Sequence, residues 1–460
     1  MPVCAYCDRS ADLKCSSCGL VYYCGKEHQK LAWKSHKSTC VAYKIEENDH
    51  LGRYAVANRD IQPGDVIMKK TPLVAGPKMI TVPICLGCHR KLQPDHVKCT
   101  KCAWGLCSAE CEESKWHIHE CKLLARAGVK PQIRNLNEKS SSYALILPLR
   151  ALLLKNTHKK QFDELLALQS HIESNMPKPI YNFLGRTLIP LLKRVFSSSE
   201  ELNIDPLQIC SIFDTNAFEV RNKHVNIRAV YSMVSFLPHD CTPNTRHLCA
   251  DDYSMSVIAT RKICKGEKIC TTYTQTLWPT LSRRTHLKTN KHFDCTCRRC
   301  SDPTELGTFA GSLKCQQCQR GLIVSTNPLD KNAAWKCQEC EDVVAACQVE
   351  TLNAQIRAEI VAAPRTPEHF EKLLQSFSHL LHAQNTHALE IKYALVQLYE
   401  SVKCTPSEAG LQRRVELCQE LLKVSSALEP GCSSFSETLE NSVRAAESAL
   451  SILRARTATD

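Results

Sequence analysis

Apolar side chains recur at helical spacing in two long stretches of the chain. The first runs from Lys122 to Asp205 and includes Leu149, Leu152 and Leu153. The second begins near Val343, and its clearest helix should start at Thr366-Pro367, because threonine caps a first turn and proline opens it. The apolar positions of that helix are Phe370, Leu373, Leu374, Phe377, Leu380 and Leu381.

Further helices are predicted after this one, ending near Glu429-Pro430-Gly431. Their apolar residues are Leu389, Leu395, Leu398, Leu411, Val415, Leu421 and Leu422. Around Pro63-Gly64, within residues 51–67, apolar residues instead alternate with a period of two, which predicts a short β-hairpin. The pattern as a whole predicts an α+β protein.

Composition favours metal binding over disulfides. The chain has 460 residues, enough for several domains, and its 29 cysteines are grouped in CxxC pairs with histidines nearby. No apolar leader precedes Cys4, and the most apolar stretch, 143–154, is short and interrupted by Pro148 and Arg150. We therefore expect an intracellular protein, in the cytoplasm, the nucleus or both, that holds zinc.

The first cysteine array offers eight metal ligands within 37 residues, enough for two tetrahedral zinc sites. They are Cys4, Cys7, Cys15, Cys18, Cys24, His28, His36 and Cys40.

A second array begins at Cys85. Its candidate ligands are Cys85, Cys88, Cys99, Cys102, Cys107, Cys111, His117 and Cys121. His117 lies four residues before Cys121, as His36 does before Cys40, which favours it over His119, although His119 remains an alternative. The second array contains few large apolar side chains and should not form a core without metal. We therefore predict that zinc supplies the folding energy of both arrays.

Two more cysteine groups lie in the second half of the chain. Cys295, Cys297 and Cys300 form a CxCxxC motif that needs a fourth ligand. Two CxxC pairs follow with the spacing of a zinc ribbon: Cys315, Cys318, Cys337 and Cys340.

Three further motifs carry a resemblance to a known family. They are Leu51-Gly52-Arg53-Tyr54, Pro238-His239-Asp240-Cys241-Thr242-Pro243-Asn244, and the segment from Gly266 to Tyr273 with Phe293 beyond it. They resemble a split SET domain, and the first array resembles a MYND finger. The chain is identified as a member of the SET-and-MYND family of lysine methyltransferases, in its arthropod branch.

This resemblance implies a ligand set for each zinc ion. Cys4, Cys7, Cys24 and His28 would hold one ion of the first finger, and Cys15, Cys18, His36 and Cys40 the other. The second array resembles a diverged finger of the same kind. Cys241 would complete the CxCxxC site as its fourth ligand. Since four protein ligands leave no open position, such zinc is structural.

The resemblance also implies a donor site for S-adenosylmethionine and a catalytic tyrosine, Tyr273. The implied donor contacts are Leu51, Gly52, Arg53, Pro238, His239, Lys291 and Phe293. Three residues depart from the family pattern: Tyr54 replaces a glycine, Pro238 an asparagine and Lys291 a tyrosine. Proline lacks the amide and the N–H, and a lysine cation would repel the positive sulfonium of the donor.

The implied architecture is α+β: a split, β-rich SET domain with zinc-finger insertions, a helical insert, a post-SET zinc site and an all-α, tetratricopeptide-like C-terminal bundle. No clear 34-residue repeat supports the last part. The expected domains are a MYND finger (1–41), the first SET part (42–84), a second finger (85–122), a helical insert (123–210), the SET core (211–294), post-SET (295–302), a zinc ribbon (303–342) and the bundle (343–460).

Zinc also changes the electrostatic picture. Six zinc ions on 21 thiolates carry a net charge of −9, which lowers the formal charge of the chain from +12 to about +3. This small excess does not favour nucleic acid as a partner. We expect a monomer that does not bind membranes.

Two functions remain open at this point. The first is an S-adenosylmethionine-dependent methyltransferase that modifies lysine in histones or other proteins and so regulates gene expression. The second is a catalytically inactive zinc scaffold, such as a transcriptional corepressor, that binds proline-containing peptides. The helical bundle would bind a protein partner or only pack against the SET domain.

Overall fold

The computed structural model describes residues 2–16, 21–196, 205–220, 225–401 and 407–457. The chain divides into two compact units whose segments alternate along the sequence. The first unit comprises Met1–Ala55, Val66–Leu237 and His247–Val257, and the second comprises Val56–Asp65, Pro238–Arg246 and Ile258–Asp460.

The first unit begins with a small zinc-finger-like part. It consists of the antiparallel strands β1 (Leu13–Lys14) and β2 (Tyr22–Tyr23) and the helix α1 (Lys26–Cys40). Tyr23 supplies the large side chain of its buried cluster, and the other members are cysteine or alanine: Cys4, Ala11, Cys15, Ala32 and Cys40. Apolar burial alone can therefore contribute little stability here.

The β-hairpin predicted around Pro63-Gly64 is wrong. The strands are β3 (Tyr43–Asn48), β4 (Gly52–Ala57), β5 (Val66–Lys70), β11 (Thr245–Cys249) and β12 (Met255–Ala259). Strand β4 pairs with β3, whereas β5 pairs with β12 in a sheet ordered β11-β12-β5. The connection between β4 and β5 pairs with a remote segment: Ala57 N–H donates to Glu267 O at 2.8 Å, and Ile61 bridges to Ile263. The backbone N–H and C=O groups of this connection therefore form hydrogen bonds with the remote segment and not across a hairpin.

The second cysteine array forms more core than its composition suggested. It contains β7 (Val97–Lys98) and β8 (Gly105–Leu106) and leads into α2 (Ile118–Arg126). Trp104 is fully buried, donates its indole N–H to Val129 O at 3.0 Å and packs edge-on against Tyr143. Ile84 and Leu86 are also fully buried. The segment therefore has apolar packing beyond its own residues, because it packs against the chain that follows it, and its dependence on zinc for folding stays a prediction.

Helices follow this array, as the spacing between Lys122 and Asp205 predicts. They are α3 (Ile146–Thr157), α4 (Lys159–Leu166), α5 (Ile172–Asn175), α6 (Pro179–Phe183), α7 (Ile189–Val195) and α8 (Pro206–Asn216). Helix α3 packs against β6 (Val74–Pro77), which lies in an antiparallel sheet ordered β6-β10-β9 with β9 (Phe218–Val220) and β10 (Ile227–Val230).

In the second unit, the motif 238–244 lies beside the segment 268–273. His239 forms a parallel bridge to Thr271. The buried Asn244 joins the two segments, since its amide N–H donates to Lys268 O at 2.8 Å and its Oδ1 accepts the Cys270 N–H at 2.7 Å. These bonds bring the neighbourhood of Tyr273 next to a motif that is distant in sequence.

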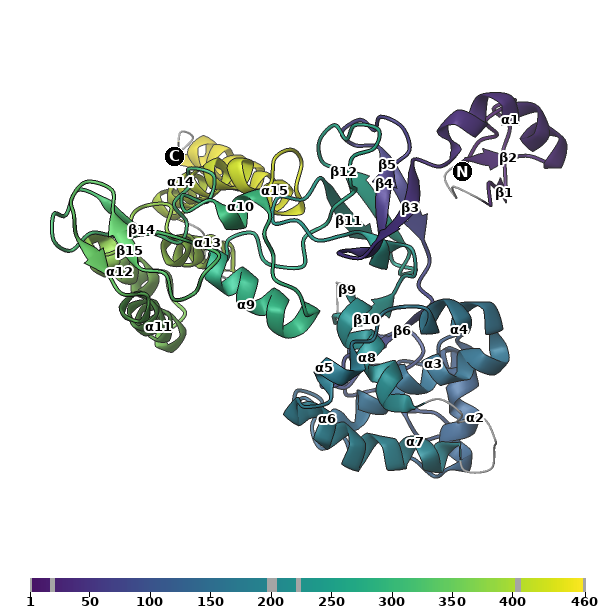
Figure 1. The fold of residues 1–460 in the computed structure, drawn as a ribbon. Helices are drawn as coiled ribbons and strands as arrows, with labels where there is room; N and C mark the ends of the chain where they lie inside the picture. The colour runs from purple at the N-terminus through teal and green to yellow at the C-terminus, as the bar shows by residue number, and fades with distance from the viewer. Residues whose placement is uncertain (1, 17–20, 197–204, 221–224, 402–406, 458–460) are drawn as a thin grey trace. The chain divides into compact units, whose positions relative to one another are not determined.

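The rest of the second unit contains a ribbon and a helical bundle. After α9 (Thr280–Lys291) and α10 (Arg298–Ser301), four short antiparallel strands form a sheet: β13 (Leu313–Lys314), β14 (Leu322–Ser325), β15 (Trp335–Cys337) and β16 (Val343–Val344). The bundle is α11 (Ala346–Ala362), α12 (Pro367–Ser376), α13 (Thr386–Ser401), α14 (Glu408–Leu428) and α15 (Ser434–Thr457). Helices α14 and α15 pack together (Figure 1).

The bundle confirms the predicted helices and corrects two details. Thr366 caps α12 as expected, by accepting the His369 N–H. However, α12 ends at Ser376 and Phe377–His379 is a 3₁₀ turn, so the apolar spacing overestimates the length of this helix. Helix α15 lies within the expected bundle (343–460), although the apolar spacing marked no individual helix beyond Glu429-Pro430-Gly431. Among the described residues, no helix is both long and apolar enough to cross a membrane.

Candidate metal centres and the tyrosine site

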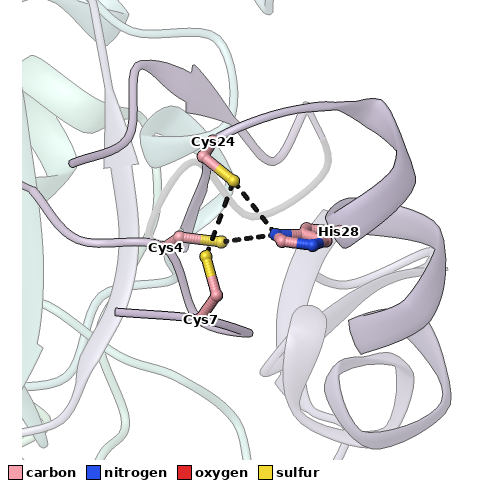
Figure 2. Close-up of side chains that lie close together, drawn as sticks. All are labelled: Cys4, Cys7, Cys24 and His28. Carbon is pink, nitrogen blue, oxygen red and sulfur yellow. Dashed lines mark hydrogen bonds between the residues drawn. The ribbon is translucent and has the colours of Figure 1, made fainter. Parts of the chain in front are cut away.

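The first finger brings four predicted ligands together at the start of α1. The ligand atoms of Cys4, Cys7, Cys24 and His28 all lie within 4.8 Å of one another. Figure 2 shows the three sulfurs around the imidazole, whose Nδ1 lies 3.0 Å from the Cys24 sulfur and 3.8 Å from the Cys4 sulfur. Three thiols and an imidazole at this separation fit a tetrahedral zinc ion.

The second set of this finger lies at the other end of α1. His36 and Cys40 are four residues apart and so share one face of the helix, and they meet Cys15, whose sulfur lies 3.6 Å from that of Cys40. Cys18, the fourth predicted ligand, lies outside the described residues. The interleaved arrangement is the one that the resemblance implied.

In the second array, the structure groups His117 and not His119 with the cysteines. His117 is fully buried with Cys99, Cys102 and Cys121, and its Nε2 lies 3.6 Å from the Cys102 sulfur. His119 is exposed. Helix α2 begins at Ile118, directly after His117. The two histidines are two residues apart, so their side chains point to different sides of this first turn.

A buried ion pair holds His117 in this orientation. Its Nδ1 lies 3.5 Å from Glu120 Oε1, and Glu120 accepts hydrogen bonds from Arg150 Nε at 2.6 Å and Nη2 at 2.8 Å. Carboxylates behind a ligating histidine fix its ring and raise its basicity. Sequence reasoning missed both residues. Glu120 sits in the run Trp116–Cys121 where a carboxylate could have been noticed, but nothing local points to Arg150.

Replacing His117 by alanine should therefore remove one zinc ion per chain, whereas replacing His119 should remove none. Elemental analysis of the purified variants measures this directly, with the wild-type protein expected to hold about six ions. Equal metal content in the two variants would mean that His117 is not a ligand.

The remaining cysteines of the second array also approach one another. The sulfurs of Cys88 and Cys107 lie 3.6 Å apart. Burial raises the pKa of Cys107, and the nearby Cys85 and Cys111 raise it further. Thiols that hinder each other's ionisation in this way fit a site where a divalent cation would compensate four thiolates.

The post-SET and ribbon groups each form a compact set of four. Cys241 joins Cys295, Cys297 and Cys300, with its sulfur 3.5 Å from that of Cys300. A hydrogen bond to Cys295 raises the pKa of Cys241, and one to Cys241 lowers that of Cys297, so a proton shared among these sulfurs would be displaced by zinc. The ribbon set consists of Cys315, Cys318, Cys337 and Cys340.

Tyr273 lies against this post-SET set among aromatic and cationic side chains. Its half-buried ring is 5.3 Å from that of His239, which is in turn 5.9 Å from Phe293. The ammonium of Lys291 lies over the Tyr273 ring, 5.7 Å from its centroid. Burial raises the pKa of the Tyr273 phenol, which therefore keeps its proton at neutral pH, and lowers the pKa of His239 to about 4, which leaves the imidazole neutral.

The other predicted donor residues are placed as follows. Gly52 adopts a left-handed backbone with φ +62°, and no atom lies within 4 Å of where a β-carbon would stand. Arg53 stacks on Phe236 at 4.5 Å, and Leu51 precedes β4. Pro238 uses its carbonyl to accept the Thr271 N–H at 3.0 Å.

The family models that match are the MYND finger, over residues 4–40, and the SET domain, over residues 52–274. Together with the zinc-type clusters, they define a SET domain protein that carries a MYND finger. The chain belongs to the SET-and-MYND family.

Its relatives agree with the arthropod branch. The chain is 30% identical over 310 residues to the SET domain-containing protein SmydA-8, isoform A, of Drosophila melanogaster. This match spans 65% of the chain and 65% of the length of the relative. It is 25% identical over 345 residues to the histone-lysine N-methyltransferase ASHR1 of Arabidopsis thaliana, covering 70% of this chain and 68% of that one. A solved SET domain of LSMT bound to lysine and AdoHcy matches 91% of this chain and 90% of that chain, at 12% identity and with a TM-score of 0.26.

Proposed function

We propose that this protein is a protein-lysine methyltransferase that uses S-adenosylmethionine and acts, on histones or other proteins, in the regulation of gene expression. The observation that carries the proposal is the half-buried Tyr273, packed with His239 and Phe293 beside a buried four-cysteine set. The Arabidopsis relative is named a histone-lysine N-methyltransferase, which supports the same reaction.

S-adenosylmethionine, when bound, supplies the methyl group. The protein's own contribution to such a transfer is to align an amine, exclude water and offer polar contacts that are already in place. Tyr273 is suited to this role, because its hydroxyl stays protonated and its ring is held by its neighbours. By resemblance, Leu51, Gly52, Arg53, Pro238, His239, Lys291 and Phe293 would contact the donor.

Two of the departures from the family pattern can be judged on their contacts. Tyr54 directs its hydroxyl to Glu46, 3.3 Å away in the β3–β4 pair, and Gly52 keeps the open backbone that a close ligand requires. These contacts are compatible with donor binding. Lys291 still conflicts with the proposed function, since its cation lies over the ring of the proposed catalytic tyrosine.

Replacing Lys291 by methionine is therefore expected to raise the rate of methyl transfer. A cation over an aromatic ring contributes about 1 kcal/mol, and the substrate lysine must displace this cation from Tyr273. Removing the cation should therefore increase the rate roughly fivefold. Lys288→Met is the matched control, because Lys288 is an exposed lysine of the same helix that pairs with Asp294. Both rates are measured with labelled donor and a mixture of histones. Equal rates would show that Lys291 does not hinder the substrate.

Donor binding is the direct test of the proposed function. Calorimetric titration of S-adenosylmethionine into zinc-replete protein should give a dissociation constant in the micromolar range, about −8 kcal/mol. Gly52→Asp should abolish the binding, because the substitution adds a charged side chain to the open backbone. Absence of binding to the wild-type protein would overturn the proposal.

A zinc scaffold is the second candidate, and one observation favours it. The first finger exposes the large side chains of Tyr6, Leu31 and Trp33, and exposed apolar side chains of this kind are available to a proline-containing peptide. Peptide binding that survives Tyr273→Phe, in a protein that does not bind donor, would support the scaffold.

A further inference from the structure

The backbone of Tyr273 is fixed by the side chain of His239. The Tyr273 N–H donates to His239 Nδ1 at 3.0 Å. This bond extends the pairing of the two segments, in which the Thr271 N–H donates to Pro238 O and the Asp240 N–H donates to Thr271 O, each at 3.0 Å. The position of Tyr273 therefore depends on where the imidazole is held.

The other nitrogen of the same imidazole reaches the post-SET cysteines. His239 Nε2 lies 3.2 Å from the sulfur of Cys241. Because Nδ1 accepts a hydrogen bond, the proton of the neutral ring is on Nε2, which must donate to the sulfur. His239 thus links a cysteine of the metal centre directly to the main chain of Tyr273.

Arg283 supplies a second donor to the same sulfur. Its Nε lies 3.3 Å from the Cys241 sulfur, and its Nη2 lies 3.6 Å from that of Cys300. The guanidinium is fully buried and cannot move freely, since Nη1 donates to Glu305 at 2.6 Å and Nη2 to Thr280 Oγ1 at 2.9 Å. Cys241 itself is only 2% exposed. The His239 and Arg283 N–H groups are therefore both aimed at the Cys241 sulfur.

The charges of this buried cluster also require an anionic partner. Arg283 and Arg299 are both fully buried and share one carboxylate, that of Glu305. A zinc ion with four thiolates carries a net charge of −2, which would more than offset the excess guanidinium charge of +1. The arrangement thus fits a metal-loaded set better than four neutral thiols.

We propose that His239 and Arg283 are positioning residues that transmit the geometry of the post-SET zinc site to Tyr273, through the path zinc–Cys241–His239–Tyr273. The proposal rests on the proposed function for its effect on catalysis. The two N–H···S bonds withdraw electron density from Cys241 and hold it in place, and the imidazole transfers that constraint to the tyrosine main chain. The post-SET zinc would then do more than hold the chain together.

His239→Phe tests the path, because phenylalanine retains the ring packing against Tyr273 and Phe293 but lacks both nitrogens. The control is His286→Phe, since His286 is a half-buried histidine of the same unit that stacks on Trp278. Each protein is loaded with Co²⁺, and the thiolate-to-metal charge-transfer band is compared with that of the wild-type protein. The band of His239→Phe should shift to lower energy, with the metal content unchanged, and the band of the control should not.

Kinetics and donor titration separate this role from direct donor contact. His239→Phe should lower kcat about tenfold or more at saturating donor, where the rate no longer depends on donor affinity. His239→Gln, which restores an acceptor and a donor, should recover part of both kcat and the cobalt band. A loss of donor affinity with an unchanged cobalt band would overturn the proposal, because His239 would then act on the donor and not through zinc.

Arg283 provides a second, independent measurement. Arg283→Gln should release zinc to a chromophoric chelator about tenfold faster than the wild-type protein, whereas its neighbour Arg284→Gln should not. If Arg283→Gln fails to fold, Arg283→Lys keeps the charge with fewer donors and should show an intermediate rate. Release rates and cobalt bands equal to those of the controls would overturn the proposal. If the wild-type protein transfers no methyl group, the proposed function fails, but these two readouts still decide whether the path exists.

Discussion

Replacing Tyr273 by phenylalanine is expected to lower methyl transfer about 100-fold or more, the usual loss when one preorganised polar contact is removed from a reacting centre. The substitution deletes only the hydroxyl. The ring contacts with His239 and Lys291 and the main-chain bond to His239 can persist, so the fold should be unaffected. Transfer from labelled donor to histones, followed by mass spectrometry of the modified lysine, measures the loss.

Two controls make this result specific. Donor affinity and zinc content of the Tyr273→Phe variant should match those of the wild-type protein. Tyr399→Phe removes another half-buried tyrosine hydroxyl, one that donates to Glu371 in the C-terminal bundle, and should leave transfer unchanged. Undiminished transfer by Tyr273→Phe would exclude this residue as the catalytic group.

Removing zinc is expected to unfold the first finger and to spare much of the second. Structural zinc in small fingers contributes about 10–16 kcal/mol of apparent binding energy, which is also their folding energy. The first finger has little else, because its buried cluster consists of cysteine, alanine and Tyr23. The second array keeps Trp104 buried against Tyr143 and bonded to Val129.

Hydrogen exchange after chelation measures this difference. Amides of α1 should exchange at the rate of an unfolded peptide, whereas those around Trp104 should keep partial protection. Adding excess zinc with the chelator is the control and should restore protection in both regions. Protection of α1 that persists without zinc would mean that apolar packing suffices for the first finger.

The comparison of sequence and structure is clearest for the zinc clusters. Ligand type and local spacing identify candidate residues, because a metal ion accepts few side chains and short loops set their separation. The structure brings together the described members of five of the predicted ligand sets, and in the remaining set the sulfurs of Cys88 and Cys107 lie 3.6 Å apart. The choice between His117 and His119, however, required the burial of the ring and the ion pair of Glu120 with Arg150 behind it.

Strand pairing shows the opposite case. The alternating pattern around Pro63-Gly64 locates two strands but gives no partner for either, because a period of two records only which face is buried. Pairing is decided by which backbone groups meet across the sequence, and here Ile61 meets Ile263 instead of its own neighbour strand.

The sequence by itself determined the helical bundle, the metal-binding residue types and the family, since all three depend on short-range spacing or on motifs that can be read in order. Only the tertiary structure decided that the side chains of His239 and Arg283 both reach the sulfur of Cys241 beside Tyr273. His239 and Arg283 are separated by 44 positions, and Tyr273 lies beside His239 because Asn244 and Thr271 join the remote segments 238–244 and 268–273. The sequence therefore indicates which chemistry is available, and long-range hydrogen bonding determines which groups can perform it together.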